Sequence, residues 1–451
     1  MGRTYIVEDV VEGYLTKQCE QTAGPVSGLL IGQSSTQREY VVTATRTPQR
    51  EESTASGGNS PDKEWVTEHA RQVSRMLPGG LSVLGVFIVT DTDAKDTLTT
   101  LRQLVFAVEN LISSERLWTS AEDDVSDRVV LHVNPKTRKT LCRTFDVKDP
   151  KSVAKPADWK YQSGVCSSWS TVSCCVSVDV LLPLCFLQEG LRGWAHQLES
   201  AVCLIDGRRL AADAELAGGQ KRNVRQTYSA QLLITPDERR LAEGVQRCGG
   251  SVSVSGAVYS TAYLHSNKPK ARQAEKRDAV STLTTRAQML LEELLTSGGA
   301  SEGKQFCLPH RVFCPVEASG PVCVCDYRFS DEGLSEVIDR LKEMLDMDAA
   351  EKDLDIRRET PAEVLEGDAA DGRTSVSPAQ CGWCFLFNKW DFCVTEVCCV
   401  FPEPTVETAE ALQSKRNYFG KRSSSVTPPY MFITSNTHVD LVPPSDNTPC
   451  C

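Results

Sequence analysis

The chain has few histidines, and their spacing excludes the common histidine-based metal motifs. Six histidines are spread over 451 residues, and no two of them lie close together. H-E-x-x-H and H-x-H patterns, which place two imidazoles on one face of a helix or strand to bind zinc, are therefore missing.

Motifs for nucleotide binding and serine hydrolysis are missing as well. The sequence has no G-x-x-x-x-G-K-[ST] loop and no G-x-S-x-G elbow. Gly79-Gly80 precedes a predicted strand rather than a helix, so it lacks the helix N-terminus that binds phosphate. We therefore assign no catalytic, cofactor-binding or metal-binding residue and expect no cofactor.

Basic residues are too few for a general nucleic-acid binder. Lysine and arginine number 49 against 60 acidic residues, a net charge of −11. Release of phosphate counterions needs a basic surface, so nucleic acid is not an expected partner.

Long uncharged apolar runs are missing too. The best candidate, 381–401, is interrupted by Lys389, Asp391 and Glu396, whereas a membrane-spanning helix needs about 18 or more nearly uncharged residues. The N-terminus lacks the basic and apolar regions of a secretory signal. We expect a soluble chain as written, with its 19 cysteines reduced.

Two short apolar stretches, 26–32 and 81–89, are typical of buried strands. The residues around them predict the order β-α-β-β-α-β-α-β-β up to residue 145. This order predicts an α/β domain over 1–147. The elements are strands 4–7, 26–32, 40–45, 81–89, 128–133 and 140–145, and helices 8–19, 65–77 and about 98–112.

A connector over 146–164 is predicted to lead into a second α+β domain over 165–347. Trp159 and Tyr161 in this connector are candidates for a protein interface, with core packing as the alternative. The second domain contains predicted strands 170–182, 228–234, 251–265, 312–315 and 322–329, and helices 187–202, 270–295 and 334–347.

The C-terminal part of the chain changes character twice. Residues 348–380 are acidic and low in aromatics, which predicts a disordered linker. Residues 381–451 are rich in Cys and aromatics and then in Ser, Thr and Pro, and we expect this tail to be unstructured. A four-cysteine zinc site is a weaker alternative, drawn from Cys381, Cys384, Cys393, Cys398 and Cys399.

The remaining chemistry-bearing residues have plain structural interpretations. We expect six cysteines to be buried core residues, and we expect the tryptophans 65, 159, 169 and 194 to pack in the core or between domains. We expect His69 to be a surface or half-buried side chain. The six cysteines are Cys142, Cys174, Cys175, Cys203, Cys323 and Cys325.

V-S-G-L-L-I-G, a helix ending in L-P-G-G-L, and S-V-L-G-V-F-I-V together resemble the MPN domain, the fold of the JAMM metallo-isopeptidases and their inactive relatives. In active members the second strand ends in a G-[WY]-x-H-x-H pattern whose histidines bind zinc. Here Ile88 and Thr90 occupy the histidine positions, and the downstream Ser-x-x-Asp is missing. The resemblance therefore implies an MPN-like domain without its metal.

More specifically, residues 1–347 resemble the odr-four homologue family, named for an abnormal odorant response in a nematode. The segments that carry this resemblance are 1–8, 26–33, 44–48, 68–80, 155–164 and 325–327. Membership implies a non-catalytic protein of the endoplasmic reticulum membrane, on its cytosolic face. It also implies a link to folding and trafficking of certain G-protein-coupled receptors, and partnership with the cysteine protease specific for the ubiquitin-fold modifier.

The family ends in one transmembrane helix, and no such stretch occurs here, so membrane association is expected from the family alone. The leading hypothesis is therefore an adaptor that docks the protease or a receptor client. Two alternatives are a metallo-isopeptidase with an atypical site and a zinc-binding tail module.

Overall fold

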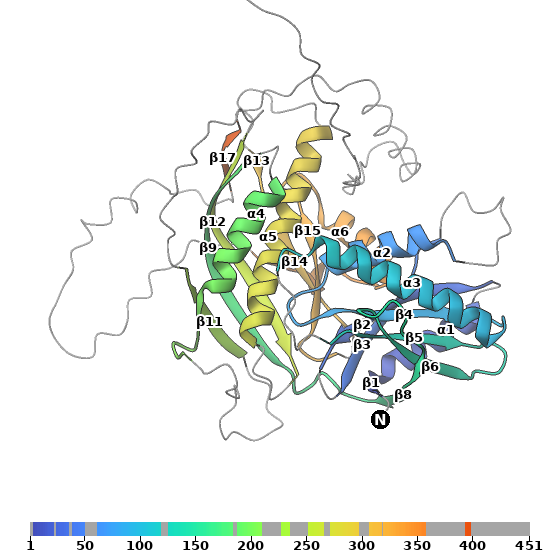
Figure 1. Cartoon of the computed structure of the whole chain (residues 1–451). Helices are drawn as coiled ribbons and strands as arrows, with labels where there is room; N and C mark the ends of the chain where they lie inside the picture. Colours follow the sequence, from blue (N-terminus) through green and yellow to red (C-terminus); the bar gives the residue numbers. More distant parts are fainter. Residues whose placement is uncertain are drawn as a thin grey trace, which may run out of the picture.

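In the part of the chain that the computed structural model describes, three sheets and six α-helices make up a mixed α+β fold (Figure 1). The structure describes residues 3–21, 24–35, 38–49, 61–118, 125–183, 187–209, 227–234, 251–265, 271–296, 306–317, 319–357 and 393–397. The predicted fold class is confirmed.

The first sheet has eight strands in the order β7-β6-β5-β4-β2-β3-β1-β8. Its centre is the antiparallel pair β2 and β4, where a Cβ on Gly28 would lie 2.4 Å from the ring of Phe87. Both apolar stretches are therefore buried strands, as predicted. The strands are β1 Thr4–Glu8, β2 Val26–Gln33, β3 Glu39–Arg46, β4 Ser82–Val89, β5 Asp127–Val133, β6 Thr140–Asp146, β7 Lys155–Pro156 and β8 Asp158–Gln162.

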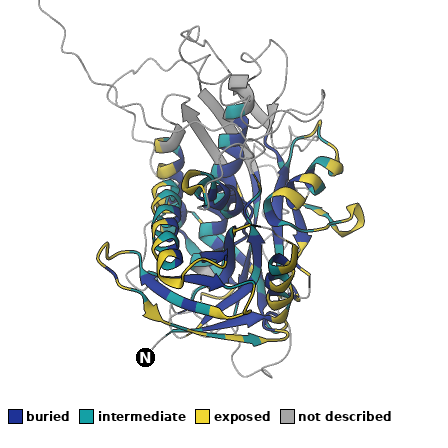
Figure 2. Ribbon diagram, turned by 90° about the vertical axis from the view of Figure 1, so that its right-hand side faces the viewer, coloured by how far each residue is buried: buried dark blue, intermediate teal, exposed yellow. Residues whose placement is uncertain are grey.

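Helices cover both faces of this sheet. Helix α1 (Asp9–Gln21) packs Val11 and Leu15 against one face, while α2 (Lys63–Arg75) and α3 (Ala94–Glu115) pack on the other. Asp62 and Asp93 accept hydrogen bonds from the first free N–H groups of α2 and α3, which fixes where these helices begin. Figure 2 shows the resulting layers, with dark blue strands between helices whose outer faces are teal or yellow. The predicted element order is confirmed.

The segment predicted as a connector instead completes the first sheet, and that part of the prediction is wrong. Strand β7 pairs with β6 and β8 pairs with β1, so they form opposite edges of the sheet although only Ala157 separates them. The sheet must curl until its two edges are bridged by one short segment. The pairing of β7 with β6 had no signal in the sequence, because β7 has only two residues and includes Pro156.

The second sheet has the order β10-β11-β9-β12-β17-β13, and α4 (Leu187–Ser200) and α5 (Ala271–Thr296) lie on one of its faces (Figure 1). Alternate residues of β9, such as Val172 and Val176, are buried beneath these helices. The strands are β9 Ser170–Pro183, β10 Val202–Ile205, β11 Thr227–Leu233, β12 Ser251–Leu264, β13 Phe306–Cys307 and β17 Cys393–Val397.

A third sheet, in the order β15-β14-β16, packs with α6 (Leu334–Leu345) against the first sheet rather than the second. Val312, Val324 and Leu341 share a core with Val86 and Leu101. The strands are β14 His310–Pro315, β15 Cys323–Arg328 and β16 Asp355–Arg357. The predicted division at 147, 165 and 347 stays a prediction, but this core joins chain segments from both sides of it.

Two predictions for the C-terminal part are wrong where the structure describes it. Residues 348–357 are not disordered linker, because they form a 3-10 turn over Glu351–Asp353 and then β16, which pairs with β14. Leu354 and Ile356 pack on the core, which outweighs the acidic character of the segment. In the tail, Cys393–Val397 forms β17, and the rest of 358–451 lies outside the described residues.

Candidate functional site

The end of β4 is the first candidate site, because the metal of an MPN hydrolase would bind there. Ile88 is 2% exposed and packs in the core beneath α3, and Thr90 is 8% exposed. The Thr90 hydroxyl is hydrogen-bonded to the Thr92 hydroxyl, and the Thr90 N–H donates to Val133 O at 3.1 Å. A buried hydrocarbon and a hydroxyl with a partner of its own provide no metal ligand.

His132 lies beside this position, and no motif in the sequence singled it out. It pairs in register with Ile88 across the parallel strands β4 and β5, so the two side chains share one face of the sheet. The Nε2 atom of His132 lies 3.1 Å from Thr90 O. One imidazole is too few for zinc, and no cluster of His, Cys, Asp or Glu in the described ranges is suited to hold a metal ion.

Burial raises the pKa of several described cysteine thiols, including Cys166, Cys174 and Cys325. Burial raises the pKa of Cys142 to about 12 and that of Cys314 to about 11. A nucleophilic cysteine needs the opposite shift, toward the thiolate. Of the six cysteines predicted as core residues, Cys142, Cys174, Cys203 and Cys325 are buried, and Cys175 and Cys323 are half-buried.

The proposed tail zinc site lies mostly outside the described residues. Cys393 starts β17, and Cys381, Cys384, Cys398 and Cys399 are not described. The zinc-binding alternative stays a prediction.

The expectation for His69 is wrong. This side chain is 4% exposed on α2, and its Nε2 lies 2.8 Å from Met344 O near the end of α6. Burial lowers the pKa of His69 to about 4, so the ring is neutral and donates this hydrogen bond. His69 therefore joins α2 to α6, a contact between segments 275 residues apart that the helical pattern could not indicate.

The aromatic residues serve packing. Trp159 and Tyr161, the interface candidates, lie against the core inside the curled first sheet, where Trp159 contacts Tyr5 at a ring distance of 6.2 Å. Trp169 and Trp194 are buried. These positions agree with the core-packing alternative.

The turn after α2 joins the first sheet to the second. Gly79 pairs with Ala262 of β12, donating to Thr261 O at 3.0 Å and accepting from the Tyr263 N–H at 2.8 Å. Gly80 has φ +82°, and a Cβ there would lie 2.0 Å from Tyr263 O. Both glycines are therefore required, one by close backbone approach and the other also by its left-handed conformation.

A buried ion pair lies beneath this turn. The Asp278 carboxylate on α5 accepts two hydrogen bonds from Arg311 of β14, at 2.7 and 2.8 Å, and both side chains are 1% exposed. The same carboxylate accepts from the N–H groups of Gly79 and Thr261 at 2.9 and 2.8 Å. Asp278 thus connects the turn after α2 with elements of the other two sheets.

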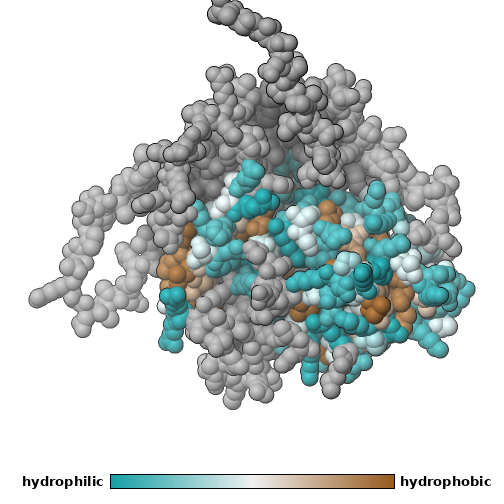
Figure 3. Space-filling model, in the orientation of Figure 1, coloured by the Kyte–Doolittle hydropathy of each residue, from teal (hydrophilic) through white to brown (hydrophobic). Residues whose placement is uncertain are grey.

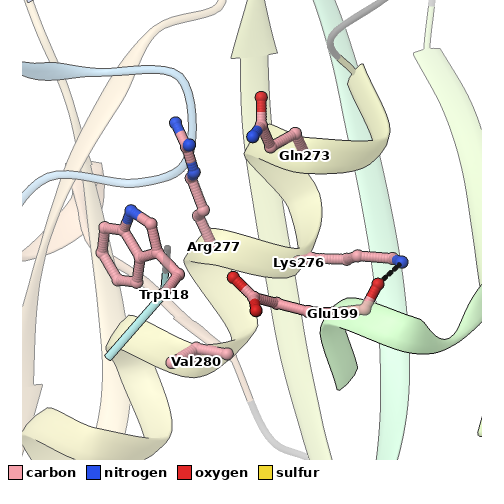
Figure 4. A pocket seen from close by; sticks show the side chains of 6 residues that line it. All are labelled: Trp118, Glu199, Gln273, Lys276, Arg277 and Val280. Carbon is pink, nitrogen blue, oxygen red and sulfur yellow. Dashed lines mark hydrogen bonds between the residues drawn. The ribbon is translucent and has the colours of Figure 1, made fainter. Parts of the chain in front are cut away.

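A shallow groove lies where the residues after α3 meet α4 and α5 (Figure 4). It has a volume of about 320 Å³, with Trp118 on one side and Glu199 on the other. The Lys276 side chain extends from α5 to the end of α4, where its Nζ donates to Glu199 O and Ala201 O at 2.6 Å each. The described residues that line the groove include no histidine, no cysteine and no pair of carboxylates, which acid–base or nucleophilic chemistry needs. Gln273, Lys276, Arg277 and Val280 form its α5 side.

The family model described as ODR4-like, Odorant response abnormal 4-like, matches residues 28–356. The chain belongs to this family. The human protein odr-4 homolog is 45% identical over 395 residues, which are 80% of this chain and 87% of the human one. The chicken homolog is 42% identical over 393 residues, again covering 80% and 87%. The family model begins inside β2 and ends inside β16. It includes all three sheets apart from β1, the first two residues of β2, the last residue of β16, and β17.

A solved structure entitled UfSP from C. elegans is similar with a TM-score of 0.40 and 9% identity, over 77% of this chain and 57% of that one. A similarity of this size does not establish a shared fold. The family assignment rests on the sequence matches alone.

Proposed function

We propose that this odr-4-like chain is a non-catalytic adaptor of the endoplasmic reticulum. In this role it recruits the cysteine protease specific for the ubiquitin-fold modifier. It also assists folding, trafficking and localisation of a subset of G-protein-coupled receptors. Membership of the family supports the general role, and the protease and the receptors are the partners that we propose.

One observation carries the non-catalytic part of the proposal. Ile88 and Thr90 fill the two positions where an MPN hydrolase places zinc ligands, and both side chains are committed to packing or to a hydrogen bond. Because Ile88 and Thr90 stand where the zinc ligands would be, the end of β4 cannot hold a zinc ion that would activate water as a Lewis acid.

On the face drawn in Figure 3, apolar residues form separate small patches among polar ones. None of the helices in the described ranges is long and apolar enough to span a bilayer. We propose residence at the cytosolic face of the endoplasmic reticulum membrane from the family relationship.

Co-purification tests the recruitment. The full chain, immobilised through a tag, is incubated with the purified protease and, in parallel, with an unrelated cysteine protease. We expect the full chain to retain the modifier-specific protease and not the unrelated one. Failure of the full chain to retain it would contradict the recruitment.

Metal analysis tests the alternative hydrolase. We expect the purified chain to contain far less than one zinc per molecule and to leave a modifier conjugate uncleaved when the protease is omitted. Stoichiometric zinc that survives deletion of 381–451 would revive the metallo-isopeptidase. Zinc that disappears with the tail would support the tail module instead.

A further inference from the structure

The segment between β6 and β7 exposes an apolar side chain. Two large apolar side chains of the described ranges are strongly exposed, Val153 at 74% and Leu233 at 53%. Ser152, just before Val153, is buried, and Ala154, just after it, packs on the core that the first and third sheets share. These two inward neighbours leave Val153 pointing away from the protein. We call residues 147–155 the Val153 loop.

Hydrogen bonds fix the shape of the Val153 loop. The Asp146 N–H donates to Ser152 Oγ at 2.9 Å, and the Ser152 N–H donates to Asp149 O at 2.9 Å. Arg102 of α3 donates to Pro150 O. The loop is therefore ordered before any partner arrives, so little conformational entropy remains to be lost when it binds.

Lysines surround the exposed valine. Lys148, Lys151 and Lys155 are all exposed. The two carboxylates of the same stretch accept hydrogen bonds from the main chain, Asp146 from the Lys148 N–H at 3.1 Å and Asp149 from the Lys151 N–H at 2.9 Å. Three ammonium groups against two carboxylates leave this stretch positive in a chain whose net charge is −11.

Two arginines next to the loop add to its positive charge. Asp127 is the carboxylate close to Lys155, at 3.8 Å, but it also accepts a hydrogen bond from Arg3 at 2.7 Å, so its single charge faces two cations. Arg102, which holds Pro150 O, lies over the ring of Phe145 and carries a further positive charge to the loop.

We propose that the Val153 loop is a docking surface for an anionic lipid bilayer, in which Val153 enters the headgroup boundary and the three lysines contact the charged headgroups. The proposal rests on the proposed residence at the cytosolic face of the endoplasmic reticulum membrane and specifies which face of the chain turns to the bilayer. An apolar side chain among cations matches a surface that is anionic outside and apolar just beneath. An acidic protein would pair with the lysines alone and would leave Val153 in water.

The contact is weak, and its effect is to orient the chain. Each lysine close to an anionic membrane strengthens binding about fivefold, and the effect decays over a Debye length of about 8 Å. Stable anchoring requires two membrane signals, so one loop of this kind sets the orientation of a chain that is held at the membrane by other means.

Vesicle sedimentation of the full chain measures the binding. The chain is titrated with vesicles of phosphatidylcholine and, in parallel, with vesicles in which roughly a third of the lipid is phosphatidylserine. We expect a partition coefficient at least about tenfold higher on the anionic vesicles, and a decrease of this preference when salt is added.

Two variants separate the charge from the apolar insertion. We expect the double variant Lys148→Gln with Lys151→Gln to bind the anionic vesicles about tenfold or more weakly. We expect Val153→Ser, which leaves every charge in place, to bind them about fivefold more weakly because the apolar part of the contact is lost.

Matched controls carry the same changes elsewhere. Lys136→Gln with Lys139→Gln removes two exposed lysines at the other end of β6, whose seven residues span about 20 Å, more than a Debye length. Leu233→Ser changes the other strongly exposed apolar side chain. Neither control should alter the partition coefficient by more than about twofold.

Equal binding to neutral and anionic vesicles, or losses as large in the controls, would overturn the proposal. A loss in the Lys148 and Lys151 variant without one in Val153→Ser would reveal a purely electrostatic contact and would overturn it as well. Retention of the protease is measured on the same preparations. A chain that retains the protease but does not bind anionic vesicles contradicts the bilayer contact alone, and the reverse result contradicts the recruitment alone.

Discussion

Asp278 and Arg311 form a bidentate ion pair that is almost completely excluded from water. Breaking one side of such a pair leaves an uncompensated buried charge, which costs about 3–5 kcal/mol. We therefore expect Arg311→Leu to lower the free energy of unfolding by about this amount, measured by urea denaturation. Arg357→Leu, at a half-exposed arginine on β16, is the control and should cost less than about 1 kcal/mol. Equal losses in both variants would contradict the central role of Asp278.

Glu275 should make the protein less stable as pH rises. Its side chain is completely buried, and neither carboxylate oxygen has a hydrogen-bond partner within the described structure. Burial first, and then the neighbouring Asp278, raises its pKa well above 4.5, so the folded state keeps a proton that the unfolded state loses.

Each pH unit over which the two states differ by one proton changes the free energy of unfolding by about 1.4 kcal/mol. We expect Glu275→Gln to be more stable than the unmodified chain at pH 8, and the difference to shrink toward pH 4.5. Urea denaturation curves across this range provide the measurement, and parallel pH profiles for the two proteins would count against a neutral Glu275.

His69, in contrast, should make the protein less stable as pH falls. Its folded pKa of about 4 lies below the ordinary 6.5, so its contribution to stability is lost as pH falls from about 6.5 toward 4. The loss is on the order of 3 kcal/mol for a difference of this size. His69→Gln keeps a donor for Met344 O but does not titrate, and we expect thermal denaturation of this variant to depend less on pH in that window. An unchanged dependence would mean that another group titrates there.

Gly80 and Gly13 offer a matched pair of alanine substitutions. Gly80→Ala places a Cβ against Tyr263 O in a left-handed conformation, and we expect a cost of about 1–3 kcal/mol or more. Gly13 lies inside α1 with open space around its Cβ position, so Gly13→Ala should add up to about 1 kcal/mol. Differential scanning calorimetry of both variants measures the contrast, and a harmless Gly80→Ala would show that the turn after α2 does not need glycine.

The local elements were predictable because each has a period or a stop signal of its own. The runs 26–32 and 81–89 contain no charge, and α2 and α3 begin directly after Asp62 and Asp93, whose side chains cap them. The absence of paired histidines and the presence of Ile88 and Thr90 at the strand end were equally visible in the sequence. Periodicity and composition are local properties, and these features depend on little else.

Pairings between distant segments could not be predicted in the same way. The two-residue strand β7 has no period, and β16 lies in a segment whose acidity suggested disorder. The neutral state of His69 depends on burial by elements far along the chain. Each of these features arises from contacts that compensate a locally unfavourable sequence, which only the tertiary structure reveals.

The sequence by itself determined most of the helices and strands, the family and the presence of Ile88 and Thr90 at the end of β4, because residue types and spacing decide these. Only the tertiary structure decided that 155–162 bridges the edges of the first sheet, that 310–357 packs on its core, and that Asp278 joins all three sheets. The physical reason is that burial, register and charge balance depend on which segments meet, and no local pattern specifies their meeting.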